Sequence, residues 1–219
     1  IVFNKAFSQA PWTLPSHYSM LTGKYPWDLG IFTPGDIISN DDITIAEALQ
    51  KQGYATKAVS YGSFVNSNWG FDKGFQIFKE DYQYNNWNDA SFIFKEALTM
   101  IYDHNAKTEK TPYFLFIRSF HTHDPYTDTE NYTIRQIVDA NTKEFIDQSI
   151  IDDFKKAHET EINELDSELE KFLKKLKKSG ELDNTVIVFT SDHGEEFGEH
   201  GKIALHFSLY DEVTHVPLI

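Results

Sequence analysis

The sequence predicts an α/β fold, a three-layer sandwich with a mostly parallel central sheet. Segments with a helical spacing of apolar residues alternate with short, almost wholly apolar runs, in the order helix then strand. Runs of that kind are typical of strands that are covered on both faces. Because strands joined through helices run in the same direction, this alternation indicates a parallel sheet.

The longer helices are recognised by their apolar spacing and by their end signals. Residues 41–53 open with acids that can cap a helix and stop at a glycine. Residues 89–104 also have helical spacing, and residues 154–179 carry one apolar stripe between lysines and glutamates. That stripe consists of Ile162, Leu165, Leu169, Phe172, Leu173 and Leu176. The strands that follow these helices are predicted at residues 54–60, 113–120 and 186–189, the last as a buried strand.

A shorter helix is predicted from Pro15 to Gly23, because proline favours the first turn of a helix and glycine its end. Thr13 would lie just before the amino end of this helix, where free backbone N–H groups and the helix dipole attract anions. Residues 61–84 are expected to form a long surface excursion. Residues 127–151 are polar without a clear period, and we expect an insertion there.

The composition excludes several classes of function. The formal net charge is −14, from 34 acidic residues against 20 lysines and arginines, and this argues against a nucleic-acid or anionic-membrane partner, which needs a basic surface. The chain has no cysteine, which excludes disulfides, thiolate metal sites and a cysteine nucleophile. No apolar run approaches the roughly 20 residues of a membrane-spanning helix. Composition leaves the compartment and the oligomeric state open.

Polar side chains that can do chemistry gather at three places. They lie at the start of the short helix, after the strand at residues 113–120, and after the strand at residues 186–189. A lone histidine is usually a satisfied structural group, but the carboxyl ends of parallel strands meet at one edge, where α/β sheets bind ligands. The candidates are Thr13, Ser16 and His17, then His121, His123 and Asp124, and then Asp192, His193, Glu195, Glu196, His200 and His206.

Asp192 and His193 are adjacent after a predicted strand, so one turn could direct both side chains to a divalent metal ion. The alternative is a capping aspartate beside an exposed histidine, and the dipeptide alone favours that alternative. Thr13 would supply an alkoxide if a metal lowered the pKa of its hydroxyl, and the helix end behind it would stabilise an incoming anion.

The segment TLPSHYSMLTGKYP, which begins at Thr13, resembles the signature of the sulfatase family in the alkaline phosphatase superfamily. In that signature the nucleophile is followed by any residue, by Pro-Ser, by a basic residue, and later by Leu-Thr-Gly. Further segments resemble the family in the same order along nearly the whole chain. They are ITIAEALQKQGYAT, GFDKGF, ELDSELEKFLKKLKKSGELDNTVIVFTSDHGEEFGEHG and LYDEVTHVPLI.

The resemblance implies a role for individual residues. Thr13 falls on the nucleophile and, with Asp192, at the metal, and His193 falls there either as a ligand or as a neighbour. His123 falls on the histidine that contacts the transferred group or the leaving oxygen, and His206 falls where sulfatases often carry a lysine for the same anion. The implied cofactor is a divalent ion (calcium, manganese, zinc or magnesium), and the implied substrate is a small-molecule or glycan ester. Residues expected around the site or at the surface are Glu195, Glu196 and His200.

The resemblance also implies an α/β sandwich of the alkaline-phosphatase and sulfatase type, with residues 1–219 as a single sulfatase-like catalytic domain. We expect this domain to be truncated at both ends. The family's first strand ends in aspartates that complete the metal site, and no such strand precedes Ile1. The chain also stops as a strand begins.

Departures from the signature shape the predicted chemistry. Thr13 cannot yield the formylglycine of true sulfatases. His17 stands where arginine is usual, and residues 60–63 read Ser-Tyr-Gly-Ser where the family has Gly-Lys-Trp-His. We therefore predict a metal-dependent hydrolase or transferase, acting on phosphoric esters (diesters or phosphonates) or sulfuric esters through a threonine nucleophile. Two alternatives stay open: an authentic sulfatase, and a non-catalytic binding module that retains the fold.

Overall fold

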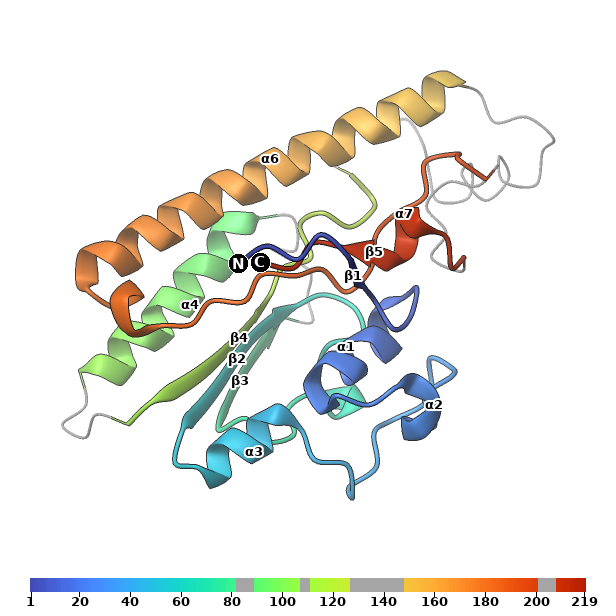
Figure 1. Ribbon diagram of the computed structural model, residues 1–219. Coiled ribbons are helices and arrows are strands. Elements are labelled where there is room, and N and C mark those ends of the chain that lie inside the picture. The colour runs from blue at the N-terminus through green and yellow to red at the C-terminus, as the bar shows by residue number, and fades with distance from the viewer. Residues whose placement is uncertain (82–88, 107–110, 127–147, 201–207) are drawn as a thin grey trace.

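The computed structural model describes residues 1–81, 89–106, 111–126, 148–200 and 208–219, with helices on both sides of a small sheet (Figure 1). The helices are α1 (Thr13–Thr22), α2 (Pro26–Leu29), α3 (Ile45–Lys51), α4 (Ala90–Asn105), α6 (Gln148–Ser179) and α7 (Asp211–Thr214), with short 3-10 helices η1 (Ser67–Trp69) and η2 (Leu182–Asn184). The strands are β1 (Ala6–Phe7), β2 (Ala55–Tyr61), β3 (Ile77–Asp81), β4 (Tyr113–Arg118) and β5 (His215–Val216).

Three strands form the central sheet in the order β3-β2-β4, and both pairings are parallel. Lys57 of β2 lies opposite Ile77 of β3 and Leu115 of β4, so the carboxyl ends of the strands share one edge. The central strand, β2, is buried along almost its whole length. The parallel sheet that the helix-then-strand order predicts is therefore confirmed.

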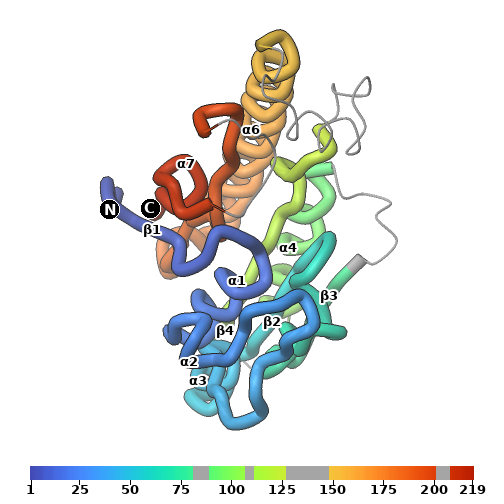
Figure 2. The backbone as a smooth tube through the Cα atoms, turned by 90° about the vertical axis from the view of Figure 1, so that its right-hand side faces the viewer, coloured from blue at the N-terminus to red at the C-terminus, as the bar shows by residue number. Residues whose placement is uncertain are grey.

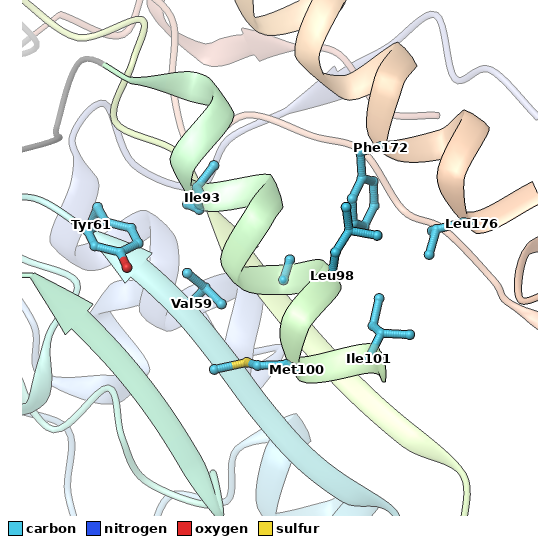
Figure 3. Close-up of a cluster of buried hydrophobic side chains, with 9 residues drawn as sticks. Val59, Tyr61, Ile93, Leu98, Met100, Ile101, Phe172 and Leu176 are labelled. Carbon is cyan, nitrogen blue, oxygen red and sulfur yellow. The ribbon is translucent and has the colours of Figure 1, made fainter. Parts of the chain in front are cut away.

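Alternate residues of β4 face two different layers of helices. Leu115 and Ile117 pack toward α4 and α6, against a buried cluster. Figure 3 shows Val59 of β2 and Phe172 of α6 in that cluster. Phe116, between Leu115 and Ile117, packs with the cluster that contains α1. The ribbon and the view at right angles to it place α4 and α6 on one side of the sheet and α1 and α3 on the other (Figures 1 and 2). The predicted α/β architecture is thus confirmed.

Short-range bonds decide where the helices begin. In α3 the Thr44 hydroxyl accepts from the Glu47 N–H and the Glu47 carboxylate accepts from the Thr44 N–H, which is a capping box. This helix therefore starts later than the predicted residues 41–53. Asp89 caps α4 by accepting from two backbone N–H groups. Thr13 is the first residue of α1, so it lies within the helix and not just before it.

The predicted surface excursion at residues 61–84 is wrong for most of its described part. β3 lies within it and pairs with β2, and Val65 and Phe71 are buried in the cluster with α1. Residues 82–84 are outside the described ranges. The sequence of β3, IFKED, does not look like a buried strand because it carries charged residues. Among the described strands β3 pairs only with β2, and such an edge strand tolerates charge that a central strand would bury.

The predicted buried strand at residues 186–189 is extended but exposed, so this prediction is also wrong. Val186 is 91% exposed and Val188 is 67% exposed. Phe189 and Ile219 exchange backbone hydrogen bonds of 3.1 and 3.0 Å. Among the described strands β4 pairs with β2 alone, so the segment lies outside the three-stranded sheet and is not covered by it. β5 pairs antiparallel with β1.

α6 begins at Gln148, earlier than the predicted start at Phe154, and so includes the last residues of the predicted insertion. The rest of that insertion, residues 127–147, lies outside the described ranges. Although α6 is long, it is highly charged. No helix in the described part of the chain has both the length and the apolar character needed to cross a bilayer.

The buried stripe of α6 differs from the prediction in its first half. Phe172 and Leu176 are buried as expected, but Ile162 is 45% exposed and the neighbouring Glu161 is buried. Phe154 packs with Tyr126 and not with α4. Glu161 lies two turns along the helix from Phe154 and on the same face, whereas Ile162 is rotated about 100° away from it.

Candidate active site

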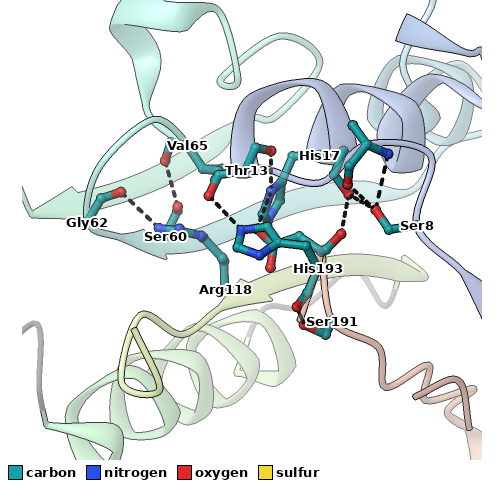
Figure 4. A network of polar contacts seen from close by, with 12 residues as sticks. Ser8, Thr13, His17, Ser60, Gly62, Val65, Arg118, Ser191 and His193 are labelled. Carbon is teal, nitrogen blue, oxygen red and sulfur yellow. Dashed lines mark hydrogen bonds and ion pairs between the residues drawn. The ribbon is translucent and has the colours of Figure 1, made fainter. Parts of the chain in front are cut away.

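The amino end of α1 lies against the turn that follows residues 186–190, and hydroxyl groups fasten the two together (Figure 4). The Ser16 hydroxyl donates to the backbone carbonyl of Asp192 over 2.7 Å, and Ser8 Oγ lies 3.0 Å from Ser16 Oγ. Ser16 is 1% exposed, so the bond is shielded from water. The serine of the Pro-Ser pair thus holds Asp192 opposite the first turn of α1.

Gly194 allows this turn to pack against the chain before β5. Its N–H donates to the Val213 carbonyl over 2.7 Å. A Cβ at this position would lie 2.1 Å from the carbonyl oxygen of Glu212, a distance that no side chain could occupy. The glycine after Asp192 and His193 is therefore required by the close approach of two backbones.

Thr13 and His193 face each other across the junction, with Thr13 Oγ1 3.4 Å from His193 Nε2. His193 Nδ1 lies 2.8 Å from the Gly194 carbonyl oxygen, which can only accept. In the neutral ring, Nδ1 therefore carries the proton and Nε2 has the lone pair. The Thr13 hydroxyl donates to that lone pair, an arrangement in which an imidazole can take a proton from a nucleophile.

His17 is buried and keeps the first turn of α1 next to Asp192. Its Nδ1 donates to the Thr13 carbonyl over 2.8 Å and lies 3.4 Å from Asp192 Oδ2. Burial lowers the pKa of His17 to about 4, and the nearby Asp192 carboxylate only partly offsets this. The residue at the position of the family's arginine is consequently neutral at neutral pH.

Asp192 is a carboxylate at neutral pH. Burial alone would raise the pKa of its side chain, but His193, His17 and Arg118 hold that pKa below its usual range. Its Oδ2 lies 3.5 Å from His193 Nε2. The structure thus brings together the three residues that the sequence places at the nucleophile and the metal: Thr13, Asp192 and His193.

Arg118, the last residue of β4, is part of this network, and the sequence did not reveal it. It is 8% exposed, and its Nη1 donates to the carbonyls of Tyr61 and Gly62, the latter over 2.9 Å. Its Cζ lies 5.0 Å from the centre of the Phe120 ring. Its charge also acts on Asp192. The available signal was one cation at the end of an otherwise apolar run.

His123, the predicted partner of the leaving oxygen, lies in the loop after β4. Its ring stacks on that of Phe120, with centres 4.1 Å apart, and its Nδ1 lies 3.1 Å from Asp124 Oδ1. Because Arg118 lies over the same Phe120, His123 is joined to the network through that ring. Its catalytic role stays a prediction. His206 lies outside the described residues.

Two further histidine candidates are bound to glutamates on helices. His121 is buried, and its Nε2 lies 3.0 Å from Glu164 Oε2 of α6. His200 Nε2 lies 3.4 Å from Glu212 Oε2 of α7, and its ring stacks on Tyr210. These contacts give both residues a structural explanation.

Glu196 is buried and Glu195 is half-buried. The Tyr126 hydroxyl donates to Glu195 Oε2 over 3.2 Å. Burial, with the charge of Asp124, raises the pKa of Glu195 to about 8, so that this side chain is mostly protonated at neutral pH. Glu196 is 1% exposed. Neither residue is a surface group, which was one of the two positions expected for them.

The model of the Sulfatase family matches residues 1–219. The chain belongs to the Sulfatase family. N-acetylglucosamine-6-O-sulfatase of Bacteroides thetaiotaomicron is 47% identical over 55 residues, which cover 25% of this chain and 10% of that protein. The ulvan-active sulfatase of Formosa agariphila is 24% identical over 255 residues, 99% of this chain and 48% of that protein. This sulfatase-family chain thus spans half or less of the length of both relatives.

Solved structures share the fold. The phosphonate monoester hydrolase of Agrobacterium radiobacter matches with a TM-score of 0.78 at 16% identity, covering 99% of this chain and 60% of that chain. A protein solved in complex with its substrate D-glucosamine-2-N,6-O-disulfate matches with a TM-score of 0.74 at 17% identity, covering 100% of this chain and 63% of that chain. At these identities the likeness concerns the fold, and it confirms the sulfatase-like architecture.

The side chains of this sulfatase-family site carry the kinds of atoms that bind divalent cations. Asp192 offers a carboxylate oxygen, His193 an imidazole nitrogen and Thr13 a hydroxyl oxygen. Within the described ranges, however, no group of three or more carboxylate, imidazole or thiolate side chains is placed to hold a metal ion. These residues could therefore hold a metal only as part of a larger set of ligands.

Proposed function

We propose that this protein is a metal-dependent hydrolase or transferase of phosphoric or sulfuric esters that uses Thr13 as its nucleophile. The observation that carries the proposal is the Thr13 hydroxyl at the amino end of α1, donating to His193 Nε2 beside the carboxylate of Asp192. Residues 1–219 would then belong to one catalytic domain.

The amino end of α1 supports the binding of an anionic group. Trp12, at the N-cap, makes no side-chain capping bond, and the first turn of the helix has no acidic residue. The first backbone N–H groups and the positive end of the helix dipole therefore lie near Thr13 without a carboxylate from their own turn. Oxygens of a phosphoryl or sulfuryl group would be held there during the attack.

In the proposed reaction, the Thr13 oxygen forms a bond to phosphorus or sulfur, and its proton passes to His193 Nε2. The bond to the ester oxygen breaks, and His123 gives a proton to the leaving alcohol. Water then attacks the ester of Thr13 and restores the hydroxyl, and an alcohol in place of water makes the reaction a transfer. When bound, a divalent cation supplies a Lewis acid that lowers the pKa of the Thr13 hydroxyl.

His193 Nε2 has one lone pair, which can accept the proton of Thr13 or bind the metal but cannot do both. If His193 is a ligand together with Asp192, the Thr13 proton leaves to solvent. If His193 is the base, the metal is held by Asp192 and other ligands.

The nucleophile favours phosphoric esters over sulfuric esters. Threonine cannot become the formylglycine that a true sulfatase uses, whereas its hydroxyl can form a phospho-threonine. The phosphonate monoester hydrolase that shares the fold agrees with this choice. The similarity to N-acetylglucosamine-6-O-sulfatase favours the sulfuric ester alternative, with a glycan ester as substrate.

The decisive experiment gives the intact protein an aryl phosphodiester, an aryl phosphonate and an aryl sulfate, with manganese, zinc, calcium or magnesium. Acid quenching and peptide mass spectrometry then look for a phosphoryl group on Thr13. We expect turnover of the phosphorus esters, and a fall of about a thousandfold or more in Thr13→Ala. Thr22→Ala, in the last turn of the same helix, is the matched control and should keep its activity.

Turnover of the aryl sulfate alone would overturn the phosphoric ester assignment, and full activity in Thr13→Ala would overturn the nucleophile. The binding-module alternative predicts that the intact protein binds no divalent metal. Metal analysis of the wild type and of Asp192→Ala tests this alternative. If the wild type binds a divalent ion and the variant does not, the binding-module alternative is excluded.

A further inference from the structure

Arg118 brings a permanent positive charge into the interior beside the candidate active site. It ends β4, lies opposite Ser60 of β2 and is 8% exposed. Burying a charged group costs several kcal/mol in proteins unless polar partners compensate. Figure 4 draws its guanidinium in one polar network with Thr13, His17 and His193.

The turn after β2 is built around this guanidinium. Arg118 Nη1 binds the carbonyls of Tyr61 and Gly62, as described above. Gly62 has a φ of 83°, and a Cβ there would lie 2.7 Å from Cγ of Phe120. Ser63 follows with a φ of 39°, a value that is unusual outside glycine and is typical of functional turns. The backbone of this turn is therefore shaped to hold the arginine in one place.

A neutral donor could have tied this turn equally well, so the positive charge itself needs an explanation. The signature has cations at the residue after Pro-Ser and in the turn after the second strand. This chain has an imidazole, His17, at the first position and Ser-Tyr-Gly-Ser at residues 60–63. Arg118 places a guanidinium against the carbonyls of that same turn, and its charge reaches His17 and Asp192.

We propose that Arg118 anchors the anionic group of the substrate, supplying from the end of β4 the fixed cation that α1 and the turn after β2 do not supply. A guanidinium suits the oxygens of phosphate, phosphonate or sulfate because its planar donors can bind two oxygens at once. The inference rests on the proposed function for the reaction that follows, but the binding step can be measured without turnover.

The test is the binding of inorganic phosphate and inorganic sulfate to the intact protein, measured by isothermal titration calorimetry. Arg118→Gln should weaken binding about tenfold or more, as expected for the loss of a hydrogen bond from a charged donor. Arg118→Lys keeps the charge without the planar pair of donors, and its affinity should lie between those of the wild type and Arg118→Gln. Should the glutamine variant fail to fold, the lysine variant carries the test.

Lys57→Met is the matched control. Lys57 is also a buried cation, on β2, and its Nζ donates to the Met100 carbonyl over 2.6 Å toward the other end of the strand. We expect this variant to lose stability without losing anion binding. Equal weakening in Lys57→Met and Arg118→Gln, unchanged binding in Arg118→Gln, or no anion binding by the wild type would each overturn the proposal.

The inference and the proposed function fail separately. A Thr13→Ala protein with full turnover would end the proposed mechanism, while Arg118-dependent phosphate binding in that same protein would leave the anchoring role standing. Conversely, Thr13 could become phosphorylated while Arg118→Gln leaves the affinity for phosphate unchanged. That result would support the proposed mechanism and contradict the anchoring role of Arg118.

Discussion

The two sides of the candidate site are held in place by different means. On one side, α1 packs in a buried cluster against a sheet whose central strand is paired on both edges. On the other side, residues 186–190 are exposed, and their described backbone partners are Leu218 and Ile219. The position of Asp192 opposite Thr13 therefore depends more on single hydrogen bonds, such as that from Ser16, than on sheet pairing.

This difference shows that an apolar run and a buried strand are not equivalent. Residues 186–189 read VIVF and residues 113–116 read YFLF, yet only the second run has a strand beside it among the described residues. Burial comes from the neighbour and not from the run itself. The following substitutions test how much stability each side contributes.

Gly194→Ala should have the largest effect, because its Cβ would meet the Glu212 carbonyl oxygen and break the contact between the turn and the chain before β5. We expect a loss of about 3 kcal/mol in the free energy of unfolding, measured in urea, with most activity lost. Gly35→Ala is the control, since the nearest atom to its Cβ is Thr33 Oγ1 at 3.9 Å. Equal stability of the two variants would show that the turn does not need this close approach.

A pair of valines compares the two sides directly. Val59 of β2 is 0% exposed, and Val59→Ala should cost about 2 kcal/mol of unfolding free energy through lost burial. Val188 is 67% exposed, and Val188→Ala should stay within about 0.5 kcal/mol. Chemical denaturation of both variants measures this difference. A large loss in Val188→Ala would mean that the segment is covered in solution and that the contrast drawn above is false.

Ser16→Ala tests the bond that joins the two sides. It leaves the Asp192 carbonyl without the buried hydroxyl, which should cost about 1 kcal/mol and lower kcat/KM as the turn shifts. Thr22→Val removes a hydroxyl that bonds within α1, to the Tyr18 carbonyl, and so controls for the loss of a helical hydroxyl. Thermal unfolding measures the stability of both variants, and steady-state kinetics measures their kcat/KM. Identical kcat/KM values in the two variants would refute a role for Ser16 in alignment.

Local signals predicted much of the fold. Proline and glycine indicated the ends of α1, the helical spacing of apolar residues indicated α4, and the apolar runs located β2 and β4. Such features depend on neighbours within a few residues, so the sequence reports them directly. β3 was missed because, among the described strands, it pairs only with β2 and so tolerates charged residues. The buried face of α6 was wrongly predicted near Ile162 because the partner of the helix changes from α4 to Tyr126 along its length.

The candidate site divides in the same way. The sequence marked Thr13, Asp192 and His193 through residue type and motif, and the structure brings these three together. The sequence could not mark Arg118, because a cation at the end of a strand is usually exposed. The structure shows that two carbonyls and an aromatic ring surround this one.

By itself, the sequence determined the order of helices and strands, the family and the kinds of side chain available for chemistry. Only the tertiary structure decided which lone pair faces Thr13, which cation is buried beside Asp192 and which apolar run stays exposed. The reason is physical: periodicity and motifs describe a segment and its immediate neighbours. The Gly194 carbonyl that orients His193, and the turn that holds Arg118, act where parts of the chain far apart in sequence meet.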